Sequence, residues 1–295
     1  MVQDFVRSPV LHSPHIDYVV NSVTYGVKMP RVGTETMVNL LIPLPPLSEQ
    51  KRIVAKIEEL LPLVDRYAAS YEKLEQFNAK FPEDMKKSIL QYAIQGKLVE
   101  QRPEEGTGEE LYQQMREEIK TLEGQKRFKV KDDSAISEDE IPFDIPESWK
   151  WLRLGQILNI ESGKGLTAKQ MRPGEIPVFG GNGITGYHDE SLIEKETVVI
   201  GRVGFYCGSV HITPKNAWIT DNAFITTYPE ESINREYLVY VLRHMNLGQN
   251  SNATAQPVVS GKKIYPMLFP LPPLAEQKRI VAKIEELMPL CERLK

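Results

Sequence analysis

The chain has 295 residues, of which 41% are apolar and 26% are charged. It is long enough for two domains with buried cores, and collagen-like or wholly disordered classes are excluded. Its two cysteines, Cys207 and Cys291, lie far apart, which excludes a disulfide framework or a structural zinc site and suits a reducing compartment. No apolar run reaches the roughly 20 residues of a membrane span, and the first residues lack a secretory signal pattern. We therefore expect a cytoplasmic protein that does not associate with membranes.

The negative charge is concentrated in one segment. The formal net charge is −4, but residues 100–148 alone carry 7 basic and 15 acidic side chains. The remainder of the chain is net positive and is therefore able to present a locally basic surface. The overall charge neither establishes nor excludes a nucleic-acid partner.

An internal repeat dominates the sequence. The stretch LIPLPPLSEQKRIVAKIEELLPLVDR at Leu41–Arg66 recurs 227 residues later as LFPLPPLAEQKRIVAKIEELMPLCER at Leu268–Arg293, with 21 of 26 positions identical. Copies this far apart do not form a solenoid. The spacing indicates a whole domain inserted between two equivalent helices, as in a tandem duplication with approximate two-fold symmetry.

The first copy predicts a long helix over Ser48–Phe81, which would span about 50 Å at 1.5 Å per residue. Its apolar residues follow a heptad spacing, which indicates left-handed coiled-coil packing. An isolated stripe of this kind is usually the core face of an ordinary helix, but here the duplication favours antiparallel packing of the two copies on each other. The expected interface residues are Ile53, Ile57, Leu60, Val64, Tyr67, Tyr71 and Leu74 in the first copy, with Ile280, Ile284 and Leu287 in the second.

The next segment changes in composition. After Phe81 a second helical stretch is expected to end at Gly96, which would serve as its C-cap. Residues 100–148 are rich in Glu, Asp and Lys. We expect a solvated acidic linker with one surface helix near Glu109–Leu122.

From Trp149 onward the pattern becomes that of a mixed α+β domain. Strands are predicted over Thr197–Gly201, Gly208–Thr213 and Ala217–Tyr228, and Asn234 is expected to cap a helix. The run FGGNGITGYH contains four glycines. They indicate either a plain hairpin turn or a place where the backbone approaches a partner closely.

Catalytic motifs are not found in the sequence. It lacks a phosphate-binding G-x-x-x-x-G-K-[ST] loop, an H-E-x-x-H zinc helix, a G-x-S-x-G elbow and the N-P-P-[YF] tetrapeptide of amino methyltransferases. The five histidines do not have the spacing of a metal site. We expect a protein that binds rather than catalyses, with no cofactor and no metal.

Three segments carry a resemblance to a known family. PLPPL[SA]EQKRIVAKIEEL in both copies, SILQYAIQGKLV at 88–99 and IPESWKWLRLGQI at 145–157 resemble the specificity subunit of type I restriction-modification enzymes, over nearly the whole chain. The resemblance implies two target recognition domains separated by conserved antiparallel helices. Each such domain reads one half of an interrupted duplex DNA sequence, and the helices dock two methyltransferase subunits, to which a restriction subunit can be added.

The resemblance also implies a division of the chain. Residues 149–266 would be a complete target recognition domain, 34–99 the central conserved region with its long helix, 100–148 the acidic linker and 267–295 the start of the distal conserved helix. Residues 1–33 would be the tail of an upstream recognition domain, with Pro30 matching Pro257. We expect a shortened product, engineered or natural, or a half-subunit that homodimerises.

The residues expected to touch DNA are cationic or amide side chains on loops, because phosphates take Lys and Arg, and base edges take Arg, Lys, Asn or Gln. Each one alone is more often a solvated surface charge. Two other hypotheses remain: a coiled-coil scaffold without DNA affinity, and a stand-alone methyltransferase or nuclease. The candidate DNA-binding residues are Lys164, Lys169, Arg172, Asn182, His188, Arg202, Lys215, Lys262 and Lys263.

Overall fold

The computed structural model describes residues 13–25, 31–248 and 258–294. The chain divides into two compact units, Met1–Lys80 and Phe81–Lys295. Pro30 and Pro257, whose match was expected from the sequence, both lie outside the described residues. Within the described residues, none of the helices combines the length and the apolar character needed to cross a membrane.

The first unit is helical in its described part. It contains α2 (Pro14–Val23), α3 (Thr34–Val38) and most of α4 (Leu47–Ile94). Helix α2 begins where the Ser13 hydroxyl accepts a hydrogen bond from the backbone N–H of Ile16 at 3.4 Å, a typical N-cap. A small core forms around the buried Ile16, with Val20, Leu40, Ile53 and Val54 packed against it.

Helix α4 is longer than predicted. The sequence predicts a helix over Ser48–Phe81 followed by a separate one, whereas α4 runs without a break from Leu47 to Ile94. Pro82 lies inside it and is buried. Proline removes a helical hydrogen bond, but packing of the following turns maintains the helix, because Ile89 and Ala93 belong to the core of the second unit. Gly96 follows with φ of +68°, as expected for a C-cap glycine.

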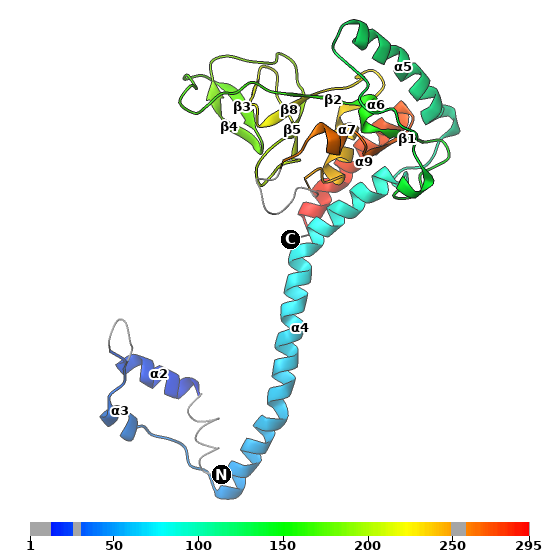
Figure 1. The fold of residues 1–295 in the computed structure, drawn as a ribbon. Coiled ribbons are helices and arrows are strands. Elements are labelled where there is room, and N and C mark those ends of the chain that lie inside the picture. Colours follow the sequence, from blue (N-terminus) through cyan, green and yellow to red (C-terminus); the bar gives the residue numbers. More distant parts are fainter. Residues whose placement is uncertain (1–12, 26–30, 249–257, 295) are drawn as a thin grey trace. The chain divides into compact units, whose positions relative to one another are not determined.

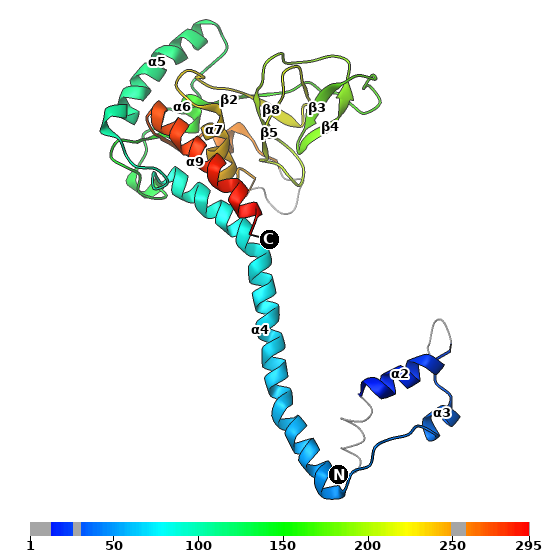
Figure 2. The ribbon, with the colours of Figure 1, turned by 180° about the vertical axis from the view of Figure 1, so that it is seen from behind.

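The second unit is a mixed α+β structure, which confirms the predicted class (Figure 1). The helical elements after α4 are η2 (Pro103–Glu105), α5 (Gly108–Gly124), η3 (Glu138–Glu140), α6 (Leu154–Ile157), α7 (Arg235–His244), α8 (Gly261–Ile264) and α9 (Leu274–Glu292). The strands are β1 (Lys150–Arg153), β2 (Asn159–Ser162), β3 (Ile176–Gly180), β4 (Gly183–His188), β5 (Val198–Gly201), β6 (Val210–Ile212), β7 (Trp218–Ile219), β8 (Ala223–Thr227) and β9 (Leu268–Leu271). Helices α5, α7 and α9 gather at one end together with β1, and strands β3, β4, β5 and β8 lie toward the other (Figures 1 and 2).

Three small sheets organise these strands. One has the order β2-β8-β5-β6 and is antiparallel, a second has the order β4-β3-β7, and the third pairs β1 with β9. Two of the three expected strands are found, as β5 and β6, while the third expected strand is divided into β7 and β8 by a turn at 220–222. The cap at Asn234 is confirmed, because its side-chain oxygen accepts from the Tyr237 N–H at 2.9 Å.

The acidic segment is not a solvated linker. Its expected helix exists as α5, but Leu111, Met115 and Ile119 are buried and belong to the main core. Phe128, further along, is buried as well. Most acidic side chains of α5 are exposed, while its inner face has the apolar spacing of a core helix. This segment is therefore part of the folded second unit.

The second repeat copy packs against the end of α4. Ile280 and Ile284 of α9 share a core cluster with Ile89 and Ala93. The Lys86 ammonium lies 3.6 Å from the carboxylate of Glu292, the last residue of α9. Because an earlier residue of α4 meets a later residue of α9, the two helices are antiparallel there. The sequence predicted that the two repeat copies pack on each other, and this prediction was wrong. The second copy shares its core with the end of α4, and Leu60 and Val64 of the first copy are exposed.

Candidate nucleic-acid interface

The loop between β5 and β6, residues 202–209, is held in one shape by its own backbone. Gly208 N–H donates to the Gly201 carbonyl at 2.7 Å, and Gly201 N–H donates to the Ser209 carbonyl at 2.8 Å. Gly204 and Gly208 have φ of +96° and +85°, a left-handed conformation that glycine adopts without strain. The loop is therefore a fixed platform at the edge of the sheet.

The glycine hairpin lies against this loop. Of the two alternatives for the glycine run, the structure has the hairpin: β3 and β4 are joined by the turn at 181–182. The Ser209 hydroxyl donates to the Gly181 carbonyl at 2.9 Å, and a Cβ added to Gly181 would lie 2.5 Å from the Val203 carbonyl oxygen. Only glycine allows this approach, which brings the exposed Asn182 beside the loop.

A third segment, 258–263, borders the same loop. Val203 and Val258 form a β-bridge, and the Val259 N–H donates to the Arg202 carbonyl at 2.9 Å. The Lys263 ammonium donates to the Val258 carbonyl at 3.3 Å, and the neighbouring Lys262 is exposed. We call the 202–209 loop, the 181–182 turn and the 258–263 segment together the β5–β6 face.

Arg202 is the best-positioned cation of this face. One guanidinium nitrogen donates to the Ser162 hydroxyl at 3.1 Å and to the Asp221 carbonyl at 3.4 Å. The guanidinium carbon lies 5.4 Å from the centre of the Phe224 ring, a cation–π distance. Because only one guanidinium nitrogen makes these bonds, the half-exposed group keeps donors for a phosphate or a guanine edge.

Burial keeps His211, next to this face, neutral. Its ring nitrogen lies 3.3 Å from the Ser209 hydroxyl. Burial, helped by the nearby Arg243 charge, lowers the pKa of His211 below its usual value of 6.5. The ring therefore adds no positive charge to the β5–β6 face at neutral pH.

Three other predicted cations are exposed around the domain. Lys164 follows β2 and holds its ammonium 5.6 Å from the centre of the Trp218 ring. It is near the β5–β6 face, because Arg202 bonds Ser162 two residues earlier. Lys169 and Lys215 are exposed on other loops, and no contact among the described residues links them to the face.

Two predicted DNA contacts need correction. His188 is 2% exposed and its ring packs edge-on against Trp218 at 5.4 Å. Its Nδ1 accepts the backbone N–H of Arg172 at 3.0 Å, so it supports the core and does not reach the surface. The Arg172 guanidinium is paired with Asp189 at 2.8 Å and with Glu190 at 2.5 Å. These carboxylates raise its pKa and offset its charge.

Sequence reasoning missed two aromatic residues at the tip of the β5–β6 loop. Phe205 is 87% exposed and Tyr206 is 56% exposed. The run R-V-G-F-Y-C-G, with aromatic residues between two glycines, was the available signal, since glycines at both ends of a short loop indicate a tight turn.

The second repeat copy attaches to the domain through buried polar groups. The carboxylate of Glu276 accepts the Trp149 indole N–H at 2.9 Å and a Gln101 amide N–H at 2.5 Å. Gln277 is fully buried, and its side-chain oxygen accepts the Asn234 backbone N–H at 2.8 Å. Arg279 pairs with Glu105 at 2.7 Å. Of the predicted interface residues in this copy, Ile280 and Ile284 are buried and Leu287 is half-buried, so they form an internal contact.

The same residues in the first copy are mostly exposed. Gln50, which corresponds to Gln277, is buried, but its side-chain oxygen has no hydrogen-bond partner among the described residues. Ile53 and Ile57 are half-buried, whereas Leu60 and the rest of the predicted seam are exposed. We call this exposed stretch the α4 seam; it consists of Leu60, Val64, Tyr67, Tyr71 and Leu74.

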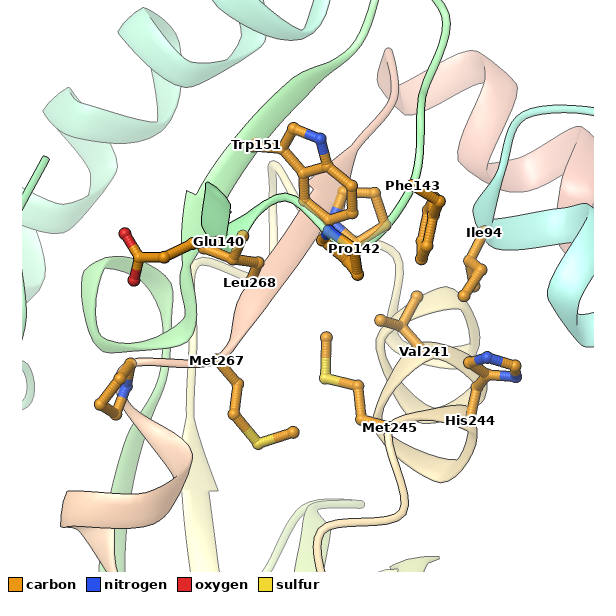
Figure 3. Close-up of a pocket in the computed structure, with 12 residues that line it drawn as sticks. Ile94, Glu140, Pro142, Phe143, Trp151, Val241, His244, Met245, Met267 and Leu268 are labelled. Carbon is orange, nitrogen blue, oxygen red and sulfur yellow. The ribbon is translucent and has the colours of Figure 1, made fainter. Parts of the chain in front are cut away.

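A pocket of about 470 Å³ lies at the helical end of the second unit (Figure 3). Trp151 and Phe143 meet edge-on at 5.1 Å on one side, and Met245 and Met267 point into it from the other. Burial lowers the pKa of His244, which lines the pocket. The pocket is mainly apolar, and its carboxylate, Glu140, already binds Arg153 at 2.9 Å. This lining does not combine a nucleophile with a base.

The sequence matches a known protein family. The family model described as "Type I restriction modification DNA specificity domain" matches residues 17–76 and 146–294. The specificity subunit of the type I restriction enzyme EcoAI from Escherichia coli is 24% identical over 328 residues, covering 86% of this chain and 54% of that protein. That of EcoprrI from the same species is 30% identical over 138 residues, covering 45% and 34%.

Two solved structures are also similar. The HsdS subunit from Thermoanaerobacter tengcongensis has a TM-score of 0.46 at 23% identity, covering 95% of this chain and 61% of that one. The type I restriction-modification S subunit from M. genitalium has a TM-score of 0.48 at 14% identity, covering 92% and 63%. The chain spans about half the length of the EcoAI subunit.

The second unit is an α+β structure with a cationic loop face, and helix α4 exposes an apolar seam. The family match covers more than half of the chain. The chain belongs to the family of type I restriction-modification DNA specificity domains.

Proposed function

We propose that the chain recognises one half of an interrupted duplex DNA target and directs methyltransferase and restriction subunits to it. The supporting observation is the β5–β6 face, where three segments distant in sequence bring Arg202, Asn182, Lys262 and Lys263 around one loop. In this proposal residues 149–266 act as the target recognition domain. The chain supplies specificity, and the catalytic centres belong to the other subunits.

The side chains divide into two roles. Arg202 and Asn182 have the donors and acceptors that read base edges, and Arg202 is pre-oriented by Ser162. Lys164, Lys262 and Lys263 suit phosphate contacts, which fix the register without reading sequence. Lys169 and Lys215 are expected to contribute less, because no described contact joins them to the face.

The experiment is a titration of fluorescent duplex DNA with the full chain at several salt concentrations. Each phosphate contact neutralised by a cation steepens the logarithmic salt dependence by about 0.9. Lys262→Ala should therefore weaken binding to all sequences and reduce the slope by nearly one. Lys215→Ala is the matched control and should change both much less. Binding that does not depend on salt would contradict the proposal.

The α4 seam supports a second element of the proposal, a protein partner. Tyr67 is 71% exposed, and Tyr71 and Leu74 are more than half exposed. A contiguous apolar surface of this kind usually marks an interaction site. We propose that it packs against a helix of a methyltransferase subunit or of a second copy of this chain. Light scattering with and without that subunit tests this, and a chain that stays monomeric and ignores the subunit would contradict it.

A further inference from the structure

The tip of the β5–β6 loop exposes two large aromatic rings to water. Phe205 is 87% exposed and Tyr206 is 56% exposed, with ring centroids 5.0 Å apart and planes at 85°. The two rings meet in a T-shaped contact, so Tyr206 braces Phe205, while most of the Phe205 side chain remains exposed. Adjacent aromatic residues this exposed form an apolar patch that suggests a binding role.

The loop is built to hold these rings outward. Cys207, directly after them, is buried, and its N–H donates to the Gly204 carbonyl at 2.9 Å. Ser209 N–H donates to the Tyr206 carbonyl at 3.1 Å. The backbone on both sides is thus fixed by hydrogen bonds, and the rings project from a closed turn. A fixed projection lowers the entropy that is lost when the rings enter a partner.

The surroundings of the rings indicate the chemistry of that partner. Arg202 begins the loop, and Val258, which bridges Val203, has the Lys263 ammonium on its carbonyl oxygen. Asn182 directly follows Gly181, whose carbonyl accepts the Ser209 hydroxyl of the same loop. The two exposed rings belong to a face that also carries cations and an amide side chain. This combination suits a ligand that has flat apolar groups next to negative charges. Stacked bases between phosphates have this structure, whereas an apolar protein groove would leave the cations without anions.

We propose that Phe205 inserts at one base step of duplex DNA and stacks on a base, with Tyr206 as its brace. This rests on the proposed function and assigns a stacking contact in addition to the hydrogen-bonding ones. Apolar side chains placed between base steps unstack them in other proteins. An aromatic contact with a base is sequence-tolerant, so Phe205 would contribute affinity and position while Arg202 contributes selection.

The test uses the full chain and a pool of 40-base-pair duplexes with random centres, in which 5-iododeoxyuridine replaces thymidine. Irradiation links this base to aromatic rings stacked on it. We expect adducts on Phe205 or Tyr206 and a roughly 5- to 150-fold loss of affinity in Phe205→Ala, the equivalent of one base–aromatic stack. The salt slope should stay unchanged, because no phosphate contact is removed. Phe205→Trp should retain binding, and Tyr92→Ala, an exposed ring at the end of α4, should match wild type.

The outcomes separate the two proposals. If the wild type shows salt-dependent binding but Phe205→Ala binds equally well and adducts fall outside the loop, the stacking proposal is overturned and the proposed function stands. If Phe205→Ala keeps DNA binding and instead loses a methyltransferase subunit, the tip is a protein contact and the stacking proposal is again overturned. If the wild type binds no duplex, both proposals fail. Tryptophan fluorescence of each variant checks its fold, and the adducts on wild type do not depend on any variant.

Discussion

The repeat allows the same substitution to be made in two different environments. Gln277 and Gln50 occupy equivalent positions, but Gln277 is fully buried and makes three hydrogen bonds: its oxygen accepts the Asn234 N–H at 2.8 Å, and its nitrogen donates to the Pro272 carbonyl at 3.1 Å and the Ser232 carbonyl at 3.3 Å. Gln277→Ala removes all three and leaves buried partners that water cannot reach. At about 0.5 to 1.5 kcal/mol for each of the three bonds, we expect a loss of about 1.5 to 4.5 kcal/mol in unfolding free energy.

Denaturant unfolding followed by tryptophan fluorescence measures this loss. All three tryptophans, at 149, 151 and 218, lie in the second unit, so the signal reports that unit. Gln50→Ala is the matched control. The Gln50 side-chain nitrogen donates to the Pro45 carbonyl at 2.8 Å, and Gln50 lies in the first unit, so this variant should leave the tryptophan transition in place. Equal shifts for both variants, or no shift for Gln277→Ala, would refute the view that buried polar contacts fix α9 to the rest of the second unit.

Three further predictions follow from the contacts of single residues. Arg202→Ala should weaken DNA binding by about 1 to 3 kcal/mol and relax preference at one position; equal affinity and equal preference in a binding assay would remove Arg202 from the interface. Tyr71→Glu with Leu74→Glu should abolish self-association or methyltransferase binding in light scattering while the tryptophan transition is retained, and persistent complexes would argue against the α4 seam. Burial raises the pKa of the Glu276 carboxyl above its usual 4.5. The folded state therefore binds the Glu276 proton more tightly than the unfolded state does. The stability that this proton contributes should fall as the pH rises from about 4.5 through the raised pKa. Glu276→Gln should remove that decline in urea unfolding from pH 4 to 8, and a wild-type stability that rises relative to this variant over the same range would contradict the assignment.

Short-range signals in the sequence predicted the local structure well. The cap at Asn234, the C-cap glycine at Gly96 and the hairpin around Asn182 are each encoded within a few residues. The long helix was predicted correctly, but its predicted end at Phe81 lies before the observed end at Ile94. Pro82 argued for a break, and the packing of Ile89 on α9, which maintains the helix, involves residues far away in the chain.

The candidate site was harder to predict, because exposure depends on contacts between distant residues. His188 and Arg172 looked like surface donors, but Trp218 covers the first and Asp189 neutralises the second. The acidic segment hid a core helix, although the spacing of Leu111 and Met115 was readable. Phe205 is exposed although it is apolar, and residue type alone favours a buried position for phenylalanine.

The most direct test of the account is selection from a random duplex pool with the full chain, followed by sequencing of the bound fraction. A specificity module enriches a short defined sequence, and Arg202→Ala should lose preference at one position of it while retaining the others. Enrichment of one half-site sequence is the predicted result. A bound fraction with the same composition as the starting pool, at a salt concentration where binding is measurable, would contradict the claim that this chain reads DNA sequence.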